Sequence, residues 1–335
     1  MLLNPGILAL LLGCSLAFAM LLYAAWLGLR ILSRWDPQSS SEAQLQLERR
    51  TYLVSTLTNY AFSFEILSGL LFIFTLEDIH SLFIGAMCAT GTLNANQIGW
   101  LVLLIKIVLF FTAAIWVHFN RLDQRTEDTP LVRPKYLGLL LLTPLVGLDL
   151  LLQYSYFTGL QPEIITSCCG SLFTLGSDSV ASELAGLPVE PTMLTFFLAA
   201  GIFLILLVLC LSSKLALFRY LLFVASLGLF FVSLAAIVSF ISLYIYQMPT
   251  HHCPFDMLQA NYGFIGYPLY GGLFIGCLYG LLPGLAQLLP KTLSLHIEIE
   301  KTERRWLLRA FFAIVIFLLI VAGPILLGPF ILLSY

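Results

Sequence analysis

Charge is the scarcest property of this sequence. Of its 335 residues, only 10% are Asp, Glu, Lys or Arg, whereas 60% are hydrophobic. A soluble domain carries about 25% charged residues and roughly 45–50% apolar ones, so too few charges are present here to cover a water-facing surface. Intrinsic disorder is excluded as well, because it requires low hydrophobicity. The composition therefore predicts an all-α polytopic membrane protein whose helices contact lipid.

Several sequence features that indicate nucleic-acid, nucleotide or haem binding are also missing. With 16 Lys and Arg against 18 Asp and Glu, no basic excess points to nucleic acid. There is no glycine-rich phosphate loop and no Cys-x-x-Cys-His motif for covalent haem. No second histidine at a suitable helical depth accompanies His118, so we expect no haem within the helices. The remaining information lies in the few polar residues inside the apolar segments and in the connections between these segments.

Long apolar runs make up most of the chain. A helix needs about 20 mostly apolar residues to cross the hydrocarbon core. Eight segments meet that criterion: 5–32, 52–75, 98–119, 135–157, 191–212, 217–246, 263–288 and 306–331. No basic residue precedes the first run, so we expect an uncleaved helix there and not a secretory signal. Residues 36–50 and 290–305 alternate polar and apolar side chains in an amphipathic way, which suits segments that lie along the membrane surface.

The basic residues predict the orientation of these spans. Fifteen of the 16 Lys and Arg lie in or beside the first, third, fifth and seventh connections. The other three connections and both ends of the sequence carry none. Cytoplasmic loops are enriched in Lys and Arg. We therefore expect a protein of the cytoplasmic (inner) membrane with both its N-terminus and its C-terminus on the extracytoplasmic side.

Two of the outward connections share a sequence pattern. Residues 88–96 and 253–261 both read Cys-x4-Leu-x-Ala-Asn, and each lies between the second and third spans of its half. Coincidence in an apolar sequence is one explanation, and a 4+4 tandem duplication, as in parallel-repeat transporters, is the other. The duplication predicts a four-helix repeat at 1–157, an extracytoplasmic loop at 158–190 and a second repeat at 191–335. It also predicts that the loops carrying the two cysteines approach each other.

The outward side is rich in thiols. Four of the seven cysteines lie there, Cys88, Cys168, Cys169 and Cys253, together with acidic residues and no basic ones. Extracytoplasmic cysteines are typical of disulfides, four allow three pairings, and adjacent cysteines seldom bridge each other. Structural disulfides from Cys88 and Cys253 to the doublet are one interpretation. The other is thiol–disulfide exchange with an extracytoplasmic thiol protein, in which Cys88 and Cys253 present the mobile sulfurs and the doublet resolves them.

The segment that follows Cys253 adds a resemblance to this second interpretation. It contains a tyrosine, Tyr262, and then Gly266-Tyr267-Pro268 at the start of the next predicted span. Residues 253–272 resemble the loop-to-helix segment of vitamin K epoxide reductase-like membrane proteins. That resemblance implies a quinone-linked enzyme that oxidises thiols. In place of the family's Cys-x-x-Cys, this sequence has the adjacent Cys168 and Cys169 before its fifth span.

Histidines next to Cys253 support a different chemistry. His251, His252 and Cys253 bring imidazole and thiolate together, and these ligands suit soft metals such as copper(I), zinc or mercury. Cys88 or the doublet would complete a tetrahedral set. A subunit that binds or transports a soft metal is therefore the main alternative. A non-catalytic subunit that scaffolds other membrane subunits is a third.

Three ionisable residues fall inside the predicted spans. Glu65, Lys106 and Asp149 each lie about 13–14 residues from the cytoplasmic end of their span, or roughly 20 Å at 1.5 Å per residue. Charges at such a depth are costly unless they are paired. We therefore expect Lys106 to pair with Glu65 or Asp149. The group is either a proton or ion relay toward the outer site, or a structural clamp between three helices.

Overall fold

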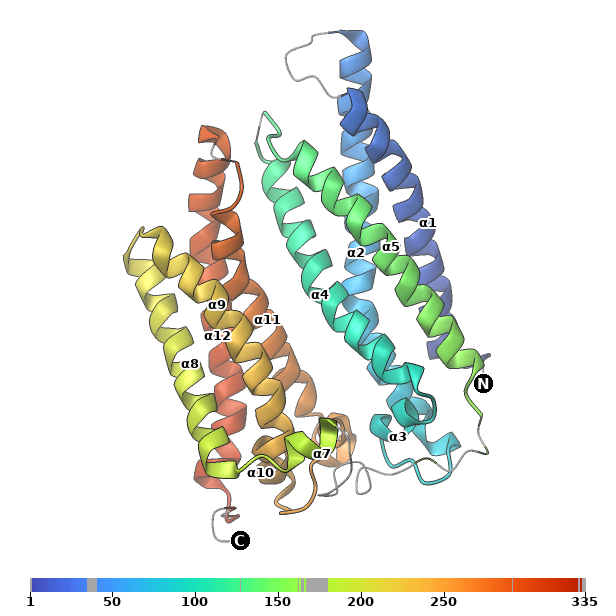
Figure 1. The fold of residues 1–335 in the computed structure, drawn as a ribbon, viewed down its shortest axis with the longest axis vertical. Helices are drawn as coiled ribbons and strands as arrows, with labels where there is room; N and C mark the ends of the chain where they lie inside the picture. Colours follow the sequence, from blue (N-terminus) through green and yellow to red (C-terminus); the bar gives the residue numbers. More distant parts are fainter. Residues whose placement is uncertain are drawn as a thin grey trace. The chain divides into compact units, whose positions relative to one another are not determined.

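The computed structural model describes residues 2–34, 41–126, 128–161, 163, 166, 180–290, 292–330 and 332. These residues form helices and turns and contain no strand, which confirms the all-α prediction (Figure 1). The long helices are α1 (Pro5–Arg34), α2 (Glu42–Ile79), α4 (Ile98–Asp123), α5 (Val132–Thr158), α8 (Val189–Ser212), α9 (Ala216–Ala236), α11 (Gly266–Ala286) and α12 (Leu293–Leu327). The π-helix η2 (Ile237–Ile241) and α10 (Ser242–Tyr246) continue α9. The short helices are η1 (His80–Leu82), α3 (Ala89–Asn94), α7 (Val180–Ala185), η3 (Asp256–Leu258) and η4 (Ala260–Tyr262).

Seven helical segments in the described part of the chain are long and apolar enough to cross a membrane. They are α1, α4, α5, α8, the continuous segment from α9 to α10, α11 and α12. This result supports an integral, multi-pass membrane protein. The helix α2, with 38 residues, occupies the place of the second expected span. Its crossing of the membrane, and hence a total of eight spans, stays a prediction.

Two of the long helices begin earlier than the apolar pattern predicts. The helix α2 begins at Glu42 and α12 at Leu293. Residues 42–50 and 293–305 are therefore the first turns of these helices, and their position along the membrane surface stays a prediction. No Pro or Gly interrupts either stretch, so nothing stops a polar helical turn from continuing into an apolar one.

The chain divides into two compact units. The first comprises Met1–Ile79, Thr92–Ile164 and Pro290–Ile299, and the second comprises His80–Gly91, Ile165–Leu289 and Glu300–Tyr335. In the first unit, α1 and α4 each pack against both α2 and α5, which makes a ring of four helices. Its core includes Leu21, Phe62, Leu109, Trp116 and Tyr136. Lipid chains are as apolar as these side chains, so close packing and polar contacts stabilise such a bundle more than the hydrophobic effect does.

The second unit is also a ring of four long helices. The helix α9 packs against α8 and α11, and α11 approaches α12 closely at Gly272. A Cβ atom there would lie 2.8 Å from the carbonyl oxygen of Ala313. The helices α8 and α12 are in contact through Phe196 and Phe317, whose aromatic ring centroids lie 5.8 Å apart. This contact completes the ring of four helices. Helix order around the ring follows the sequence in both units, as a duplication requires, and the duplication itself stays a prediction.

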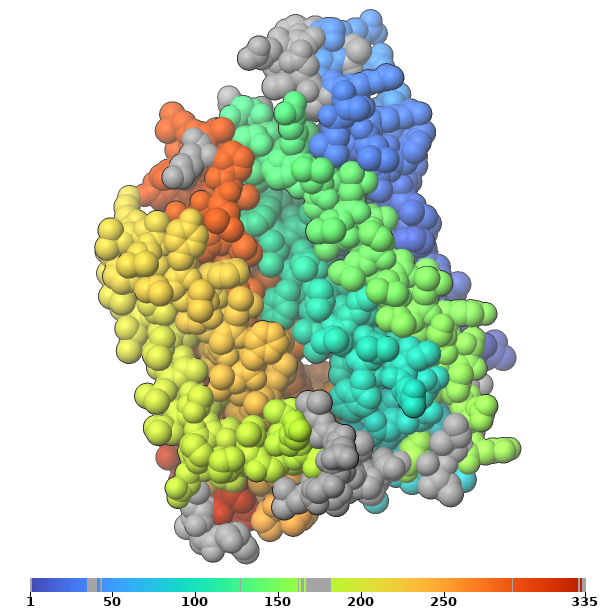
Figure 2. All heavy atoms as spheres, viewed as in Figure 1, coloured from blue at the N-terminus to red at the C-terminus, as the bar shows by residue number. Residues whose placement is uncertain are grey.

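Apolar side chains also cover outer surfaces of the second unit. The helix α8, whose surface is visible in yellow-green and yellow in Figure 2, exposes many large apolar residues. They are Leu194, Leu198, Ile202, Ile205 and Val208. Monomeric soluble proteins rarely expose a contiguous apolar patch of this kind. Contact with lipid is the physical explanation.

Candidate functional site: a buried dithiol beside an aspartate

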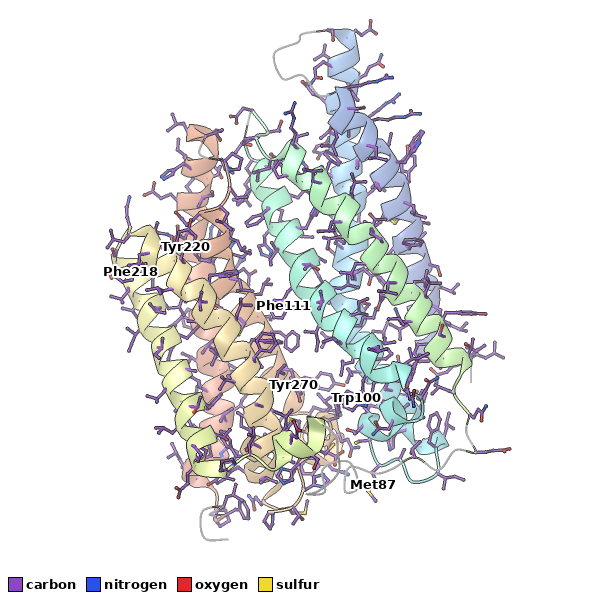
Figure 3. All side chains as sticks on the ribbon, viewed as in Figure 1. Met87, Trp100, Phe111, Phe218, Tyr220 and Tyr270 are labelled. Atoms are coloured by element: carbon purple, nitrogen blue, oxygen red, sulfur yellow. The ribbon has the colours of Figure 1, made fainter. Side chains whose placement is uncertain are left out.

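Two loop segments of the second unit meet at a pair of cysteines. Cys88, just before α3, and Cys253, just before η3, are buried thiols whose Sγ atoms lie 3.4 Å apart. Thr90 Oγ1 also lies 3.4 Å from the Cys253 sulfur. Gln259 Nε2 donates a hydrogen bond of 2.9 Å to the carbonyl of Met87, which Figure 3 labels. The predicted approach of the two cysteine loops is confirmed.

Asp256 lies between these thiols and a histidine. Its Oδ1 accepts a hydrogen bond of 3.3 Å from the Cys253 thiol, and its Oδ2 lies 2.5 Å from His251 Nε2. Burial opposes the charge on this carboxyl. Hydrogen bonds from His251, Cys88 and Cys253 outweigh the effect of burial and hold the pKa of Asp256 below its usual value. At neutral pH, Asp256 is therefore an anion that accepts hydrogen bonds from both thiols.

Two tyrosines from neighbouring helices hold the loop that carries Cys253. The hydroxyl of Tyr246, the last residue of α10, donates to the carbonyl of Cys253 at 2.7 Å and accepts the N–H of Met257 at 2.9 Å. Tyr270 of α11, labelled in Figure 3, donates to the carbonyl of Pro254 at 2.7 Å. The position of Cys253 is thus set by two helices and not by the loop alone.

The predicted metal ligands are brought together only in part. The two cysteine sulfurs and a carboxylate oxygen of Asp256 all lie within 4.8 Å of one another, a spacing that suits a metal ion. His251 contacts this group through Asp256. His252 Nδ1, by contrast, lies 2.9 Å from the carbonyl of Val238. A carbonyl only accepts hydrogen bonds, so Nδ1 of His252 carries a proton. Burial lowers the pKa of His252, which favours the neutral ring. The third potential metal ligand beside the two sulfurs is therefore Asp256 and not His252.

The other two predicted thiols, Cys168 and Cys169, lie outside the described residues. Their pairing with Cys88 or Cys253 therefore stays a prediction. Thr166, two residues before the doublet, donates its N–H to the carbonyl of Ile84 at 3.0 Å. This hydrogen bond brings the chain just before the doublet to the segment that carries Cys88.

An apolar groove of about 410 Å³ lies in the same unit. The residues lining it come from α10, η4, the turn after η4, and α12, and they include Ile245, Tyr262, Ile265, Leu319, Ile320 and Pro324. The ring centroid of Tyr262 lies 4.7 Å from that of Tyr246. Since Tyr246 donates to the carbonyl of Cys253, two aromatic rings connect the groove to the thiol pair.

A second polar cluster is buried in the first unit. Lys106 Nζ lies 2.7 Å from Asp149 Oδ2 and 3.7 Å from Glu65 Oε2. The predicted pairing of Lys106 is confirmed, and it involves both acids. Lys106 also donates to Ser68 Oγ at 2.7 Å, and Gln153 Nε2 donates to Asp149 Oδ2 at 2.6 Å.

Four members of the two sites were missed from the sequence. Cys14 Sγ in α1 lies 3.7 Å from Lys106 Nζ and 3.3 Å from Gln153 Nε2. Ser68 and Gln153 follow the two buried acids by three and four positions. This spacing places side chains on one helix face and is a usable signal. Asp256 follows Cys253 by three residues in a loop, where this spacing does not place two side chains on one face. Nothing in the sequence around Cys14 indicates its contact with Lys106.

The fold and its two clusters define a class: a multi-pass helical membrane protein with a buried dithiol–carboxylate site in one unit and a buried lysine–carboxylate cluster in the other. No family model, no curated protein and no solved structure matches the chain. Its function is therefore inferred from these sites and from the sequence.

Proposed function

We propose that this protein is a thiol–disulfide oxidoreductase of the cytoplasmic membrane in which Cys88 and Cys253 form one redox couple. The observation that carries the proposal is the 3.4 Å contact between two buried sulfurs that lie 165 residues apart in the sequence. Sulfurs in contact need only a small side-chain movement to form a bond. Two separate loops supply them, so the contact is not a by-product of chain neighbourhood.

The proposed cycle transfers two electrons and two protons. A substrate dithiol attacks the Cys88–Cys253 disulfide, and a mixed disulfide resolves to give the substrate disulfide and the protein dithiol. A quinone then takes two electrons and two protons from the dithiol, which restores the protein disulfide and yields the quinol. The resemblance of residues 253–272 to vitamin K epoxide reductase-like proteins and the apolar groove beside Tyr262 support a quinone as the acceptor. A thiol of the Cys168–Cys169 doublet takes the substrate sulfur from the mixed disulfide and frees the protein thiol. The second substrate thiol then attacks this new mixed disulfide, which releases the substrate disulfide and returns the doublet thiol.

Asp256 biases this couple toward its reduced state. A disulfide has no S–H group, so the hydrogen bonds that Asp256 accepts from the two thiols exist only in the dithiol. An interaction that stabilises the reduced form makes a couple more oxidising. That bias suits a couple that withdraws electrons from substrate thiols.

We place the thiol pair on the extracytoplasmic side. In the second unit, Lys214 and Arg219 flank the start of α9, whereas Cys253 follows the end of α10, at the opposite end of the same continuous span. Basic residues favour the cytoplasmic side. The opposite end then faces the oxidising compartment in which disulfides persist.

The redox function is tested with reduced, purified protein in lipid vesicles. Addition of a short-chain ubiquinone is expected to yield one quinol per protein, with a Cys88–Cys253 disulfide that mass spectrometry identifies. Addition of dithiothreitol should return the pair to thiols. Cys88→Ser or Cys253→Ser should abolish both steps, because the couple needs two sulfurs.

The matched controls are other cysteine variants. Cys210→Ser and Cys277→Ser change buried cysteines of the same unit that pack in α8 and α11, and both should retain the quinol yield. Cys168→Ser with Cys169→Ser should lose exchange with a thiol protein but keep oxidation by the quinone. A pair that stays in one state through both additions would show a purely structural role and would end this proposal.

A metal-binding or transport subunit is the second candidate, and the observation that favours it is the carboxylate of Asp256 near both sulfurs. Two thiolates and a carboxylate suit zinc, and thiolates also suit copper(I). Equilibrium dialysis of the reduced protein against Zn²⁺ should then give one bound ion. Binding should be lost in Cys253→Ser, weakened in Asp256→Asn and unchanged in His252→Gln. Zinc retained by Cys253→Ser would contradict this second function.

A further inference from the structure

The buried cluster of the first unit collects polar side chains from four helices. They are Cys14 from α1, Glu65 and Ser68 from α2, Lys106 from α4, and Asp149 and Gln153 from α5. All are buried, with at most 2% of any of them exposed. Two carboxylates and one ammonium give a net charge of −1 when all are ionised. A net charge buried among apolar helices is costly, so the cluster favours uptake of one further positive charge.

Of the two buried acids, Glu65 is the one whose charge is compensated less. Asp149 Oδ2 accepts short hydrogen bonds from Lys106 and Gln153, at 2.7 and 2.6 Å. Glu65 Oε2 lies 3.7 Å from the Lys106 ammonium. The Ser68 hydroxyl lies 3.3 Å from this Oε2 but only 2.7 Å from the main-chain carbonyl of Glu65, and it has one proton to donate. Within the described residues, Glu65 Oε1 is buried with no hydrogen-bond partner.

Other oxygens of the cluster also lack a donor. Among the described residues, Asp149 Oδ1 and Gln153 Oε1 are buried with no hydrogen-bond partner. A carboxylate oxygen of Glu65, one of Asp149 and the Cys14 sulfur lie within 4.8 Å of one another. A protonated Glu65 would supply an O–H donor among these acceptors. A metal ion fits this place less well, because the Lys106 ammonium already lies among these atoms.

We propose that Glu65 holds one exchangeable proton and that the first unit is a proton-binding site separate from the thiol pair. In the protonated state, a neutral Glu65 lies beside the Lys106–Asp149 ion pair. On release, the O–H bond of Glu65 breaks and its proton passes to water. Lys106 then moves toward Glu65 to compensate both carboxylates. The titratable groups that face Glu65 from the packed helices are Cys14, Lys106 and Asp149.

The test uses full-length protein in lipid vesicles and dicyclohexylcarbodiimide, an apolar reagent that modifies protonated carboxylic acids. Mass spectrometry is expected to find the adduct on Glu65 near neutral pH, and the yield should fall as the pH is raised. Asp149 should stay unmodified, since its carboxylate is ion-paired. Glu65→Gln, which imitates the protonated state, should fold normally and lose the adduct.

A second variant separates protonation from mere access of the reagent. In Asp149→Asn, Lys106 has Glu65 as its one remaining acidic partner in the cluster, so Glu65 becomes ionised and its labelling should fall about tenfold or more. Modification of Asp149 in place of Glu65, or no change of labelling in Asp149→Asn, would overturn the proposal. Suppression of the labelling by NaCl at constant pH would show that a metal cation competes for the site and would overturn it too. Quinol yield at the thiol pair is measured in parallel, so failure of either proposal is seen independently.

Discussion

Replacing Lys106 by methionine is expected to lower the free energy of unfolding by about 3–5 kcal/mol, because removal of one partner leaves a buried charge uncompensated. Asp149 Oδ2 would keep only its hydrogen bond from Gln153, and Glu65 would lose the ammonium that lies 3.7 Å away. Unfolding of the purified protein in mixed micelles, followed by circular dichroism during an SDS titration, measures the change. The loss should shrink as the pH is lowered, because protonation of Asp149 removes the uncompensated charge.

A double variant and a surface control make this result specific. Adding Asp149→Asn to Lys106→Met removes the stranded carboxylate, so most of the lost stability should return, and the coupling of the two changes should be large. Lys214→Met is the matched control. Its side chain is 87% exposed and pairs with Glu300 at the surface, so its loss should change stability by about 0.5 kcal/mol or less. Equal losses for Lys106→Met and Lys214→Met would contradict a buried, charge-paired cluster.

The long helices were predictable because one physical requirement dominates them. A span must be apolar over about 20 residues, and this leaves a signal that a single sequence displays. Helix starts were predicted less well. The first turns of α2 and α12 are polar, so hydropathy excludes them from an apolar span and does not indicate that the helix begins before it. A division of the chain into two halves was predicted from the repeat, but no sequence signal indicated that residues 80–91 belong to the second compact unit and residues 290–299 to the first.

The two sites differ in how far the sequence reveals them. Lys106 could be matched to its acids because a buried charge needs a partner and helix geometry fixes depth. The approach of Cys88 and Cys253 could be predicted because the two loops that carry them share a sequence motif. Cys14 could not be found, because a thiol that packs against lipid or helices and one that contacts a charge look the same in sequence. Asp256 depends on the path of η3 and on the tyrosines that hold its loop, which local spacing does not encode.

Replacing Asp256 by asparagine is expected to make the Cys88–Cys253 couple less oxidising. An amide oxygen accepts weaker hydrogen bonds from thiols than a carboxylate does, so the dithiol loses stabilisation while the disulfide, which has no S–H, loses none. A difference of about 1.4 kcal/mol between charge-assisted and neutral hydrogen bonds corresponds to a tenfold change in the equilibrium constant and a potential about 30 mV more negative. Equilibration of the protein in dithiothreitol buffers of graded potential, followed by gel-shift alkylation with a polymer-linked maleimide, measures it.

The direction of this shift tests how Asp256 acts, because only hydrogen bonds present in the dithiol produce it. His252→Gln is the matched control. Its ring contacts the carbonyl of Val238 and not the carboxylate, so the potential should not move. His251→Gln should give a smaller shift of the same sign as Asp256→Asn or none, since His251 reaches the sulfurs only through Asp256. A more positive potential in Asp256→Asn would mean that the carboxylate destabilises the dithiol, and the bias toward the reduced state would then have to come from another group.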